Sequence, residues 1–234
     1  MRPAGNGVDP VLYPDIVRAG SLQRALQAEC DAAGHQLRAF LPSAPGWRQV
    51  GARVEDNQWC TNVLMARLER SFSVNFWARG VLMARGSTGD LSEVAGAAAT
   101  WRSGVRVRDL GAAWAYVRFG PLAEAHERGE AAEFTWRRYA ENAHQAPQLT
   151  RLASFVNLAI QEPRMRALMP FTSHWRLGFS RTVGYPYSGD CPWVIPLDDG
   201  RYQVRAADGR EWGIGDATAS LNLVLAALDD PTPS

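Results

Sequence analysis

A short motif occurs twice in the chain, 128 residues apart. The segments LRAFLPSAPGWR (37–48) and MRALMPFTSHWR (165–176) align without a gap. Identical residues occupy five of the aligned positions, namely Arg38/Arg166, Ala39/Ala167, Pro42/Pro170, Trp47/Trp175 and Arg48/Arg176. Arg53 and Arg181 share the same offset. We therefore expect the chain to build one local structure at two places.

Similar patterns flank both copies of this motif. Apolar residues at helical spacing precede and follow each copy. The turn dipeptides Arg79-Gly80 and Asp208-Gly209 lie between alternating segments and predict a β-hairpin in each half. Each half is thus expected to contain a helix, a strand led by the motif, further strands and a second helix. The predicted helices cover residues 22–33, 91–101, 149–160 and 221–228.

We predict an α+β fold with two pseudo-symmetric helix–antiparallel strands–helix repeats. Repeat one covers about residues 22–101, and repeat two covers about residues 149–228. An all-helical insert, about 102–148, lies between them, with helix breakers at Gly120-Pro121 and Gly129, and residues 1–20 form a lead-in arm. The strands form two short sheets or one continuous sheet. Neither half obviously buries its sheet alone, so a single fused domain, residues 1–234, is expected.

The composition excludes several classes of function. All 25 basic residues are arginine, so P-loop, kinase and Schiff-base lysines are excluded. The net charge is +1 without a basic block, and we expect no nucleic-acid partner. The longest apolar runs are too short to span a bilayer, and the N-terminus lacks the apolar region of a secretory signal. Three widely spaced cysteines are typical of reduced thiols, so a cytoplasmic protein without a membrane partner is expected.

Sequence motifs for cofactors and metals are also missing. No GxGxxG follows a predicted strand, which leaves a dinucleotide site unsupported. The sequence has neither HExxH nor CxxC. One Glu-x-x-His occurs at Glu141 and His144, but a di-iron bundle needs two such motifs. We therefore expect neither an organic cofactor nor a metal ion.

Residues found in only one copy of the motif are better functional candidates than shared residues, which are most simply structural. Pro42/Pro170 and Trp47/Trp175 are expected to hold the strand entry and the core. Copy one has Gly46 in the position of His174, and the loop GYPYSGD (184–190) has no counterpart. If residues 173–182 form a strand, its faces alternate. The core face would carry Trp175, Leu177, Phe179 and Arg181, and the polar face would carry His174, Arg176, Gly178 and Ser180.

The polar face and the loop together suggest acid–base chemistry. His174 would act as a general acid or base near neutral pH, with Asp190 to orient it. The expected substrate-binding residues are Arg176 as an anion anchor, Ser180 on the pocket wall, and Tyr185 and Tyr187 as hydrogen-bond donors. Alternatively, His174 contacts a backbone carbonyl and the tyrosines only pack the loop.

Cys191 has two interpretations as well. A cysteine close to a histidine and an aspartate can be a nucleophile. Cys191-Pro192 opens an apolar segment, however, and free cysteine is among the most buried residue types. The segment GFSRT around Ser180 lacks the last glycine of a nucleophile elbow.

Three segments carry a resemblance to a known family. They are EPRMRALMPFTSHWRLGFSRTVGYPYSGDCPWVIP (162–196), the closing DGRYQV and GDATASLNLVLAAL, and LYPDIVRAGSLQRAL (12–26). They resemble an actinobacterial family of unknown function whose members are labelled natural-product biosynthesis proteins. The resemblance implies a role in specialised metabolism and a cytoplasmic location. It supplies no catalytic residues.

Two functions remain open at this point. The first is a cofactor-independent enzyme of a biosynthetic pathway. It would catalyse the cyclisation, isomerisation or elimination of a small-molecule or peptide intermediate. The second is a non-catalytic protein that holds a biosynthetic peptide or a pathway enzyme against a strand edge or an aromatic groove. Convergence of His174, Asp190 and a tyrosine on one enclosed concavity would favour the enzyme. A flat exposed face would favour the binding protein.

Overall fold

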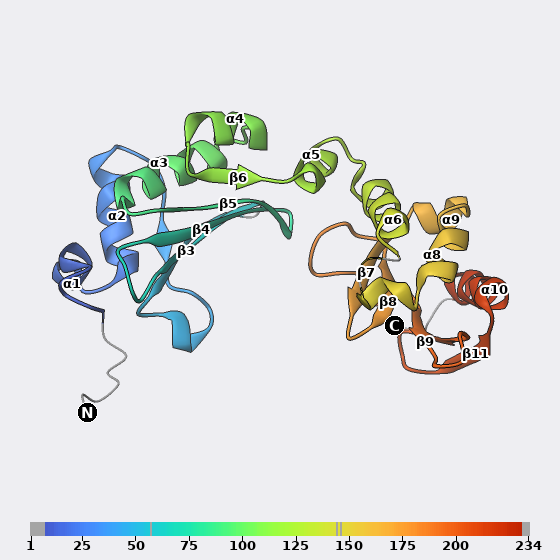
Figure 1. Ribbon diagram of the computed structural model, residues 1–234. Coiled ribbons are helices and arrows are strands. Elements are labelled where there is room, and N and C mark those ends of the chain that lie inside the picture. Colours follow the sequence, from blue (N-terminus) through green and yellow to red (C-terminus); the bar gives the residue numbers. More distant parts are fainter. Residues whose placement is uncertain (1–7, 57, 144, 146, 231–234) are drawn as a thin grey trace, which may run out of the picture. The chain divides into compact units, whose positions relative to one another are not determined.

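The computed structural model describes residues 8–56, 58–143, 145 and 147–230. The chain divides into two compact units, Met1–Glu124 and Ala125–Ser234. Each unit combines helices with an antiparallel sheet, which confirms the predicted α+β class (Figure 1). In the described part of the chain, no helix has both the length and the apolar character needed to cross a bilayer.

The N-terminal unit is built on a six-stranded antiparallel sheet whose strands follow one another in sequence order. Helices α2 and α3 pack on one face of this sheet and on each other (Figure 1). The strands are β1 (Ala39–Phe40), β2 (Gly51–Glu55), β3 (Trp59–Met65), β4 (Phe72–Ala78), β5 (Val81–Thr88) and β6 (Val117–Phe119). The helices are α1 (Pro14–Ala19), α2 (Leu22–Ala32), the 3₁₀ turn η1 (Pro45–Trp47), α3 (Leu91–Arg102) and α4 (Val107–Ala113), and α5 (Pro121–Glu127) crosses the unit boundary.

Local sequence signals explain where these elements begin and turn. Ser21 Oγ accepts a hydrogen bond from the Arg24 amide and caps α2, and Asp90 caps α3 through the Ser92 amide. Arg79 and Gly80 both have positive φ and form the predicted two-residue turn between β4 and β5. Because strand side chains alternate, one face of the sheet is buried under the helices and the other is left outside.

Residues 1–20 were expected to form a lead-in arm, and the described part of this segment differs. It contains α1, whose Ile16 is fully buried, and Tyr13 is 2% exposed. The Tyr13 hydroxyl accepts a hydrogen bond from the Ser71 amide (3.0 Å) and lies within 3.0 Å of the Ala66 carbonyl. Arg70 donates two hydrogen bonds to Asp15. These contacts tie α1 to the β3–β4 turn.

The insert expected between the two halves is not entirely helical. Val117, predicted to lie in a helix, belongs to β6, which pairs with β5. A side chain at Gly86 would come within 2.4 Å of the Tyr116 carbonyl, so glycine lets this segment approach β5. Likewise, Gly96 on α3 leaves room for the Trp114 ring. The prediction was wrong here because it relied on the helical spacing of apolar residues. It did not consider that the outer edge of β5 could pair with this segment.

The C-terminal unit has a five-stranded antiparallel sheet of order β11-β10-β9-β8-β7. Its strands are β7 (Met169–Ser173), β8 (Arg176–Ser180), β9 (Trp193–Pro196), β10 (Tyr202–Arg205) and β11 (Glu211–Gly215). Its helices are α6 (Ala131–Glu141), α7 (Pro147–Thr150), α8 (Ala153–Ala159), α9 (Pro163–Arg166) and α10 (Ala217–Asp229). The predicted break at Gly129 is confirmed by its positive φ, whereas the helix expected over 149–160 is divided between α7 and α8.

Each unit has its own core. In the C-terminal unit, Trp136 is fully buried and its Nε1 donates to the carbonyls of Met165 (2.9 Å) and Leu168 (3.0 Å). Its ring stacks on Phe179 at 5.9 Å. The two units have separate cores, so each unit buries residues of its own sheet. This differs from the expectation that neither half buries its sheet alone. The fused domain over residues 1–234 stays a prediction.

The two copies of the motif form hairpins with one shared register. Pro170 lies opposite Phe179 in the β7–β8 pair. Subtracting 128 from both numbers gives positions 42 and 51, which continue the β1–β2 register of Ala39 opposite Val54. In both units, a helix precedes five successive antiparallel strands and a second helix follows them. A pseudo-symmetric arrangement of the two units stays a prediction.

The tips of the two hairpins differ from what the motif suggested. Trp47 and Trp175, expected in the core, are 52% and 57% exposed. Trp47 ends the 3₁₀ turn η1, and Trp175 lies in the turn between β7 and β8. Both tryptophans therefore leave the sheet where the hairpin bends, and they cannot follow the alternation of the strands.

Candidate functional site

His174 lies at the tip of the β7–β8 hairpin. His174 and Trp175 have φ values of 48° and 65°, and Ser173 pairs with Arg176 on either side of them. Two left-handed residues between paired strands are the geometry of a type I′ turn. The His174 side chain is exposed, and a hydrogen bond of 3.0 Å links its Nδ1 to Ser173 Oγ. Its position is thus explained by the turn.

Replacing this turn by the sequence that its geometry prefers tests the assignment. The double substitution His174→Asn, Trp175→Gly is expected to raise the free energy of unfolding by about 1 kcal/mol, since left-handed backbone is costly for most L-residues. Urea denaturation measures the change. A clear loss of stability would contradict the turn assignment. The same variant removes the imidazole that acid–base catalysis would need.

Ser180 anchors the loop between β8 and β9. Its hydroxyl accepts from the amides of Thr182 (3.0 Å) and Ser188 (2.9 Å) and donates to the Thr182 carbonyl (2.7 Å). The side chain is fully buried. Ser180 was expected on a pocket wall, but the loop folds over it and uses up its hydrogen-bonding capacity. Its role in the structure is therefore to fix the loop.

Removing this hydroxyl should release the loop while the sheet remains. Ser180→Ala leaves two amides without their acceptor and is expected to lower the free energy of unfolding by about 1–3 kcal/mol. Hydrogen exchange should accelerate at the amides of Thr182 and Ser188, while exchange within β10 stays slow. Unchanged exchange at both amides would count against the anchor role.

Asp190 closes the same loop from its other end. It accepts a hydrogen bond of 2.6 Å from Arg181 Nε, and this bond lowers the pKa of Asp190. At neutral pH the carboxylate is thus ionised and paired with an arginine. Arg53 is the counterpart of Arg181 at the 128-residue offset. It likewise forms an ion pair, with Glu55 at 2.8 Å.

The structure does not bring His174 and Asp190 into one site. His174 precedes β8, whereas Arg181, the partner of Asp190, follows it. A strand of five residues is about 16 Å long, so the two groups lie at opposite ends of β8. The predicted catalytic pair is therefore not formed in this structure. The sequence placed both residues near one segment but could not show their separation along it.

The cavity beside Asp190 is also too small for a substrate. Its volume is about 10 Å³, which is room for one water molecule. Trp212 and Arg210 line it together with Asp190. Trp212 Nε1 is a buried N–H group without a hydrogen-bond partner among the described residues.

The outer face of the sheet carries four aromatic rings in contact. Tyr187 stacks on Phe171 at 4.3 Å with an interplanar angle of 15°, and Phe171 meets Trp193 edge-on at 5.1 Å. Tyr185 continues the series at 6.4 Å from Tyr187. We call Tyr185, Tyr187, Phe171 and Trp193 the aromatic row. Tyr185 and Tyr187 are 72% and 37% exposed, so the row ends in solvent.

Backbone pairing fixes the inner half of the aromatic row. Phe171 on β7 lies opposite Gly178 on β8, which lies opposite Trp193 on β9. A Cβ atom at Gly178 would come within 2.6 Å of the Phe171 ring and 2.8 Å of the Trp193 ring. The absent side chain therefore lets the two rings meet across the middle strand. Arg176, two residues earlier on the same face, is exposed and remains able to bind an anion.

Phe171 and Trp193 were not among the residues singled out from the sequence. Phe171 alternates with the buried Pro170, and Trp193 alternates with the buried Val194, so the period-2 pattern did contain a signal. Nothing local indicated that the two rings share a face. That information lies in the register of β7, β8 and β9.

The three cysteines have thiols that stay protonated near neutral pH. Cys191 is buried, and burial raises the pKa of its thiol, so it is protonated near neutral pH. Burial likewise raises the pKa of Cys30 and of Cys60 to about 11. Across the described ranges, no three His, Cys, Asp or Glu side chains are placed to hold a metal ion.

Comparison with known proteins concerns only the C-terminal unit. Residues 130–230 match the model of a family of unknown function, DUF6193. No curated protein and no solved structure matches the chain. The match contains all four residues of the aromatic row and leaves the N-terminal unit outside it. A DUF6193 domain of unknown function is thus found at residues 130–230.

Proposed function

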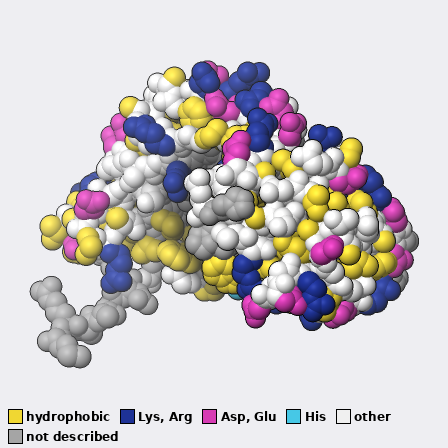
Figure 2. Space-filling model, turned by 45° about the vertical axis from the view of Figure 1, so that its right-hand side comes forward, with side chains coloured by type: hydrophobic (Ala, Val, Ile, Leu, Met, Phe, Trp, Pro, Cys, Tyr) yellow, Lys and Arg dark blue, Asp and Glu magenta, His cyan; other side chains and the backbone are white. Residues whose placement is uncertain are grey.

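We propose that the C-terminal unit is a binding module, and that its aromatic row holds a peptide intermediate or a partner enzyme of a biosynthetic pathway. The observation that carries this proposal is the aromatic row, in which Tyr185 and Tyr187 are exposed and pack on the half-buried Phe171 and Trp193. Aromatic rings provide a large contact area at a low cost in side-chain entropy. Hydrophobic side chains also reach the molecular surface in patches bordered by charged residues (Figure 2).

The occupant that suits this surface is an extended peptide. Proline-rich and aromatic segments dock on rows of tyrosine and tryptophan, because stacked rings form shallow grooves between them. The hydroxyl groups of Tyr185 and Tyr187 add hydrogen-bond donors at the solvent-exposed end of the row. Arg176, which lies two residues before Gly178 on β8, would bind a carboxylate of the peptide.

Acid–base catalysis, the other function considered from the sequence, has less support. It would require His174 and Asp190 to act on one substrate. His174 is accounted for by the hairpin turn and Asp190 by its pair with Arg181. The cavity at Asp190 holds no more than a water molecule. The geometry therefore favours the binding module.

Peptide selection followed by calorimetry tests the proposal. Twelve-residue peptides displayed on phage are selected on the full-length chain, and the selected sequences are titrated against the wild type and Tyr187→Ala. We expect micromolar binding to the wild type and a loss of about tenfold or more for Tyr187→Ala, since central aromatic residues dominate such interfaces.

The exposed tryptophan of the same unit supplies the control. Trp175→Ala removes a ring outside the aromatic row and should change the affinity less than about twofold. The proposal fails if selection yields no peptide, or if both variants weaken binding equally.

The wider setting is part of the same proposal. The resemblance of the segments 12–26 and 162–196 suggests specialised metabolism of actinobacteria, and it suggests that the protein acts in the cytoplasm. The matching registers of the β1–β2 and β7–β8 pairs support a duplicated helix–strands–helix element. We propose that the two repeats arose from one such element and are related by pseudo-symmetry.

A further inference from the structure

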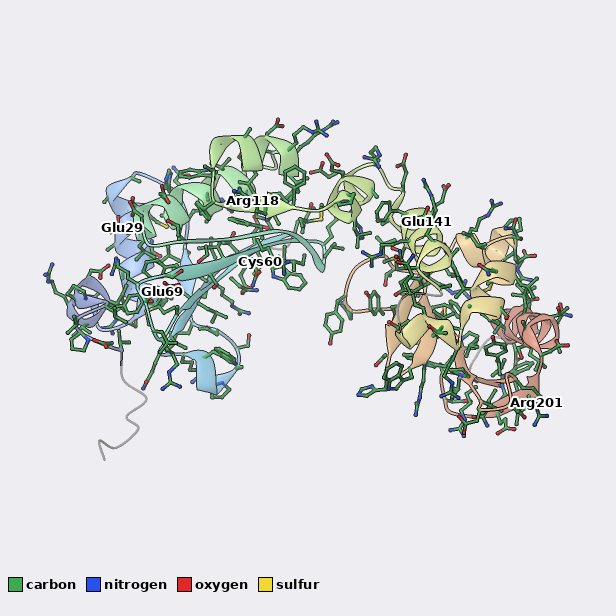
Figure 3. The ribbon with its side chains drawn as sticks, in the orientation of Figure 1. Glu29, Cys60, Glu69, Arg118, Glu141 and Arg201 are labelled. Carbon is green, nitrogen blue, oxygen red and sulfur yellow. The ribbon has the colours of Figure 1, made fainter. Side chains whose placement is uncertain are left out.

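The outer face of the N-terminal sheet carries one continuous row of polar side chains. Arg53 on β2 lies opposite Asn62 on β3, and Asn62 lies opposite Asn75 on β4. Asn75 in turn lies opposite Arg85 on β5, and Arg85 lies opposite Arg118 on β6. Directly opposed residues project from the same face, so these five side chains form a line across the sheet, the polar row. Figure 3 labels Arg118 at one end of it.

The polar row lies outside the core of its unit. The residues on either side of Asn75, Val74 and Phe76, are buried under α2 and α3, and Val63 beside Asn62 is buried in the same way. By alternation, the asparagines project from the opposite face. Adjacent strands are about 4.8 Å apart, so the row extends about 19 Å from β2 to β6.

Hydrogen-bond donors on this face outnumber their acceptors. Within the described ranges, the side chains of Asn75 and Arg85 have no hydrogen-bond partner, and the Asn62 side-chain amide only accepts a weak bond from Cys60 Sγ (3.5 Å). Arg53 Nε and Trp77 Nε1 are buried N–H groups without a partner in the same part of the chain. Trp77 lies opposite Cys60, which is labelled in Figure 3, and belongs to this face.

The charge on this face is positive. Glu55 neutralises Arg53 at 2.8 Å, and the polar row itself contains no carboxylate. Arg118 donates to the Ala115 and Val117 carbonyls through Nη1 only, which leaves its other guanidinium N–H groups available. Arg85 and Arg118 thus present two adjacent guanidinium groups at one end of a line of amides.

We propose that the polar row binds an extended acidic segment of a polypeptide. The side-chain amides of Asn62 and Asn75 each offer one acceptor and two donors, which match the carbonyl and N–H of a peptide backbone. Arg85 and Arg118 match carboxylates, with which guanidinium groups form paired hydrogen bonds. A flat line of about 19 Å suits an extended chain of about six residues. This site lies in the N-terminal unit and goes beyond the function proposed for the aromatic row.

Fluorescence anisotropy with the full-length chain tests the proposal. The probe is a labelled peptide of about ten residues that alternates Glu and Ser, with both ends blocked, at physiological ionic strength. Counterparts with Gln or Lys in place of Glu measure the need for negative charge. We expect saturable binding of the Glu peptide and binding at least about tenfold weaker for both counterparts.

Variants assign the binding to the polar row. Arg85→Ala should weaken it about tenfold or more, and Asn75→Ala about fivefold. Arg106→Ala is the matched control, because Arg106 is an exposed arginine at the start of α4 in the same unit. It should change the affinity less than about twofold. Thermal unfolding by circular dichroism verifies that each variant is folded.

Four outcomes would overturn the inference. They are no saturable binding of the Glu peptide, an equal loss for Arg106→Ala and Arg85→Ala, no effect of Asn75→Ala, and tighter binding of a single-stranded oligonucleotide. The third outcome would leave only general electrostatic attraction. Tyr187→Ala should not alter binding of the Glu peptide, so failure here and failure of the proposed function are distinguishable.

Discussion

Trp136→Ala is expected to lower the free energy of unfolding of the C-terminal unit by about 4 kcal/mol. Truncating a buried tryptophan typically costs about 3–5 kcal/mol, because contacts are lost and a cavity remains. Trp136 is fully buried, and its ring stacks on Phe179. Its Nε1 also donates to the carbonyls of Met165 and Leu168, which lead the chain into β7. Urea denaturation followed by circular dichroism measures the loss.

Two further tryptophan variants separate the causes. Trp136→Phe keeps most of the ring but removes the donor, so about 1–2 kcal/mol should be lost. Trp175→Ala truncates an exposed tryptophan of the same unit and should change stability by less than about 0.5 kcal/mol. Equal effects of Trp136→Ala and Trp175→Ala would show that burial of Trp136 is not what stabilises the unit.

Gly178→Val is expected to open the aromatic row while the sheet remains. The new side chain would collide with the Phe171 and Trp193 rings, whose atoms lie 2.6 and 2.8 Å from the added Cβ. Such overpacking costs about 1–3 kcal/mol, and valine is otherwise favourable in a strand. The nuclear Overhauser contact between the Phe171 and Tyr187 rings should disappear. Affinity for the selected peptides should fall about tenfold or more.

Gly189 provides the matched glycine control. A Cβ atom at Gly189 meets nothing within 4 Å, so Gly189→Ala should leave both the ring contacts and the peptide affinity unchanged. If Gly178→Val binds the selected peptides as tightly as Gly189→Ala, the aromatic row is not the binding surface. If Gly178→Val unfolds, the smaller substitution Gly178→Ala repeats the comparison.

Local signals in the sequence anticipated much of the secondary structure. The helices expected over 22–33 and 91–101 form as α2 and α3, and Arg79-Gly80 turns the chain between two strands, as their spacing predicts. These features depend on side chains within about four residues of one another. The prediction failed where a distant partner decides, as at Val117, which pairs with Gly86 on the free edge of β5.

The candidate site shows the same division. The sequence separated His174 and the loop 184–190 from the shared motif, and the loop does supply Tyr185 and Tyr187 to the aromatic row. It gave wrong surroundings for Ser180, because the loop returns over this residue and binds its hydroxyl. The sequence also suggested that Asp190 orients His174, although the two residues lie at opposite ends of β8.

The sequence by itself determined the α+β class, the hairpin turn at Arg79-Gly80, and the motif that appears in both halves. Only the tertiary structure decided which side chains share a face. Phe171 meets Trp193 because β7, β8 and β9 pair in one register with a glycine between the rings. Asn75 joins Arg85 for the same reason, through the pairing of β4 with β5. Strand register is set by contacts between distant segments, and a shift of one residue would reverse every side chain of a strand.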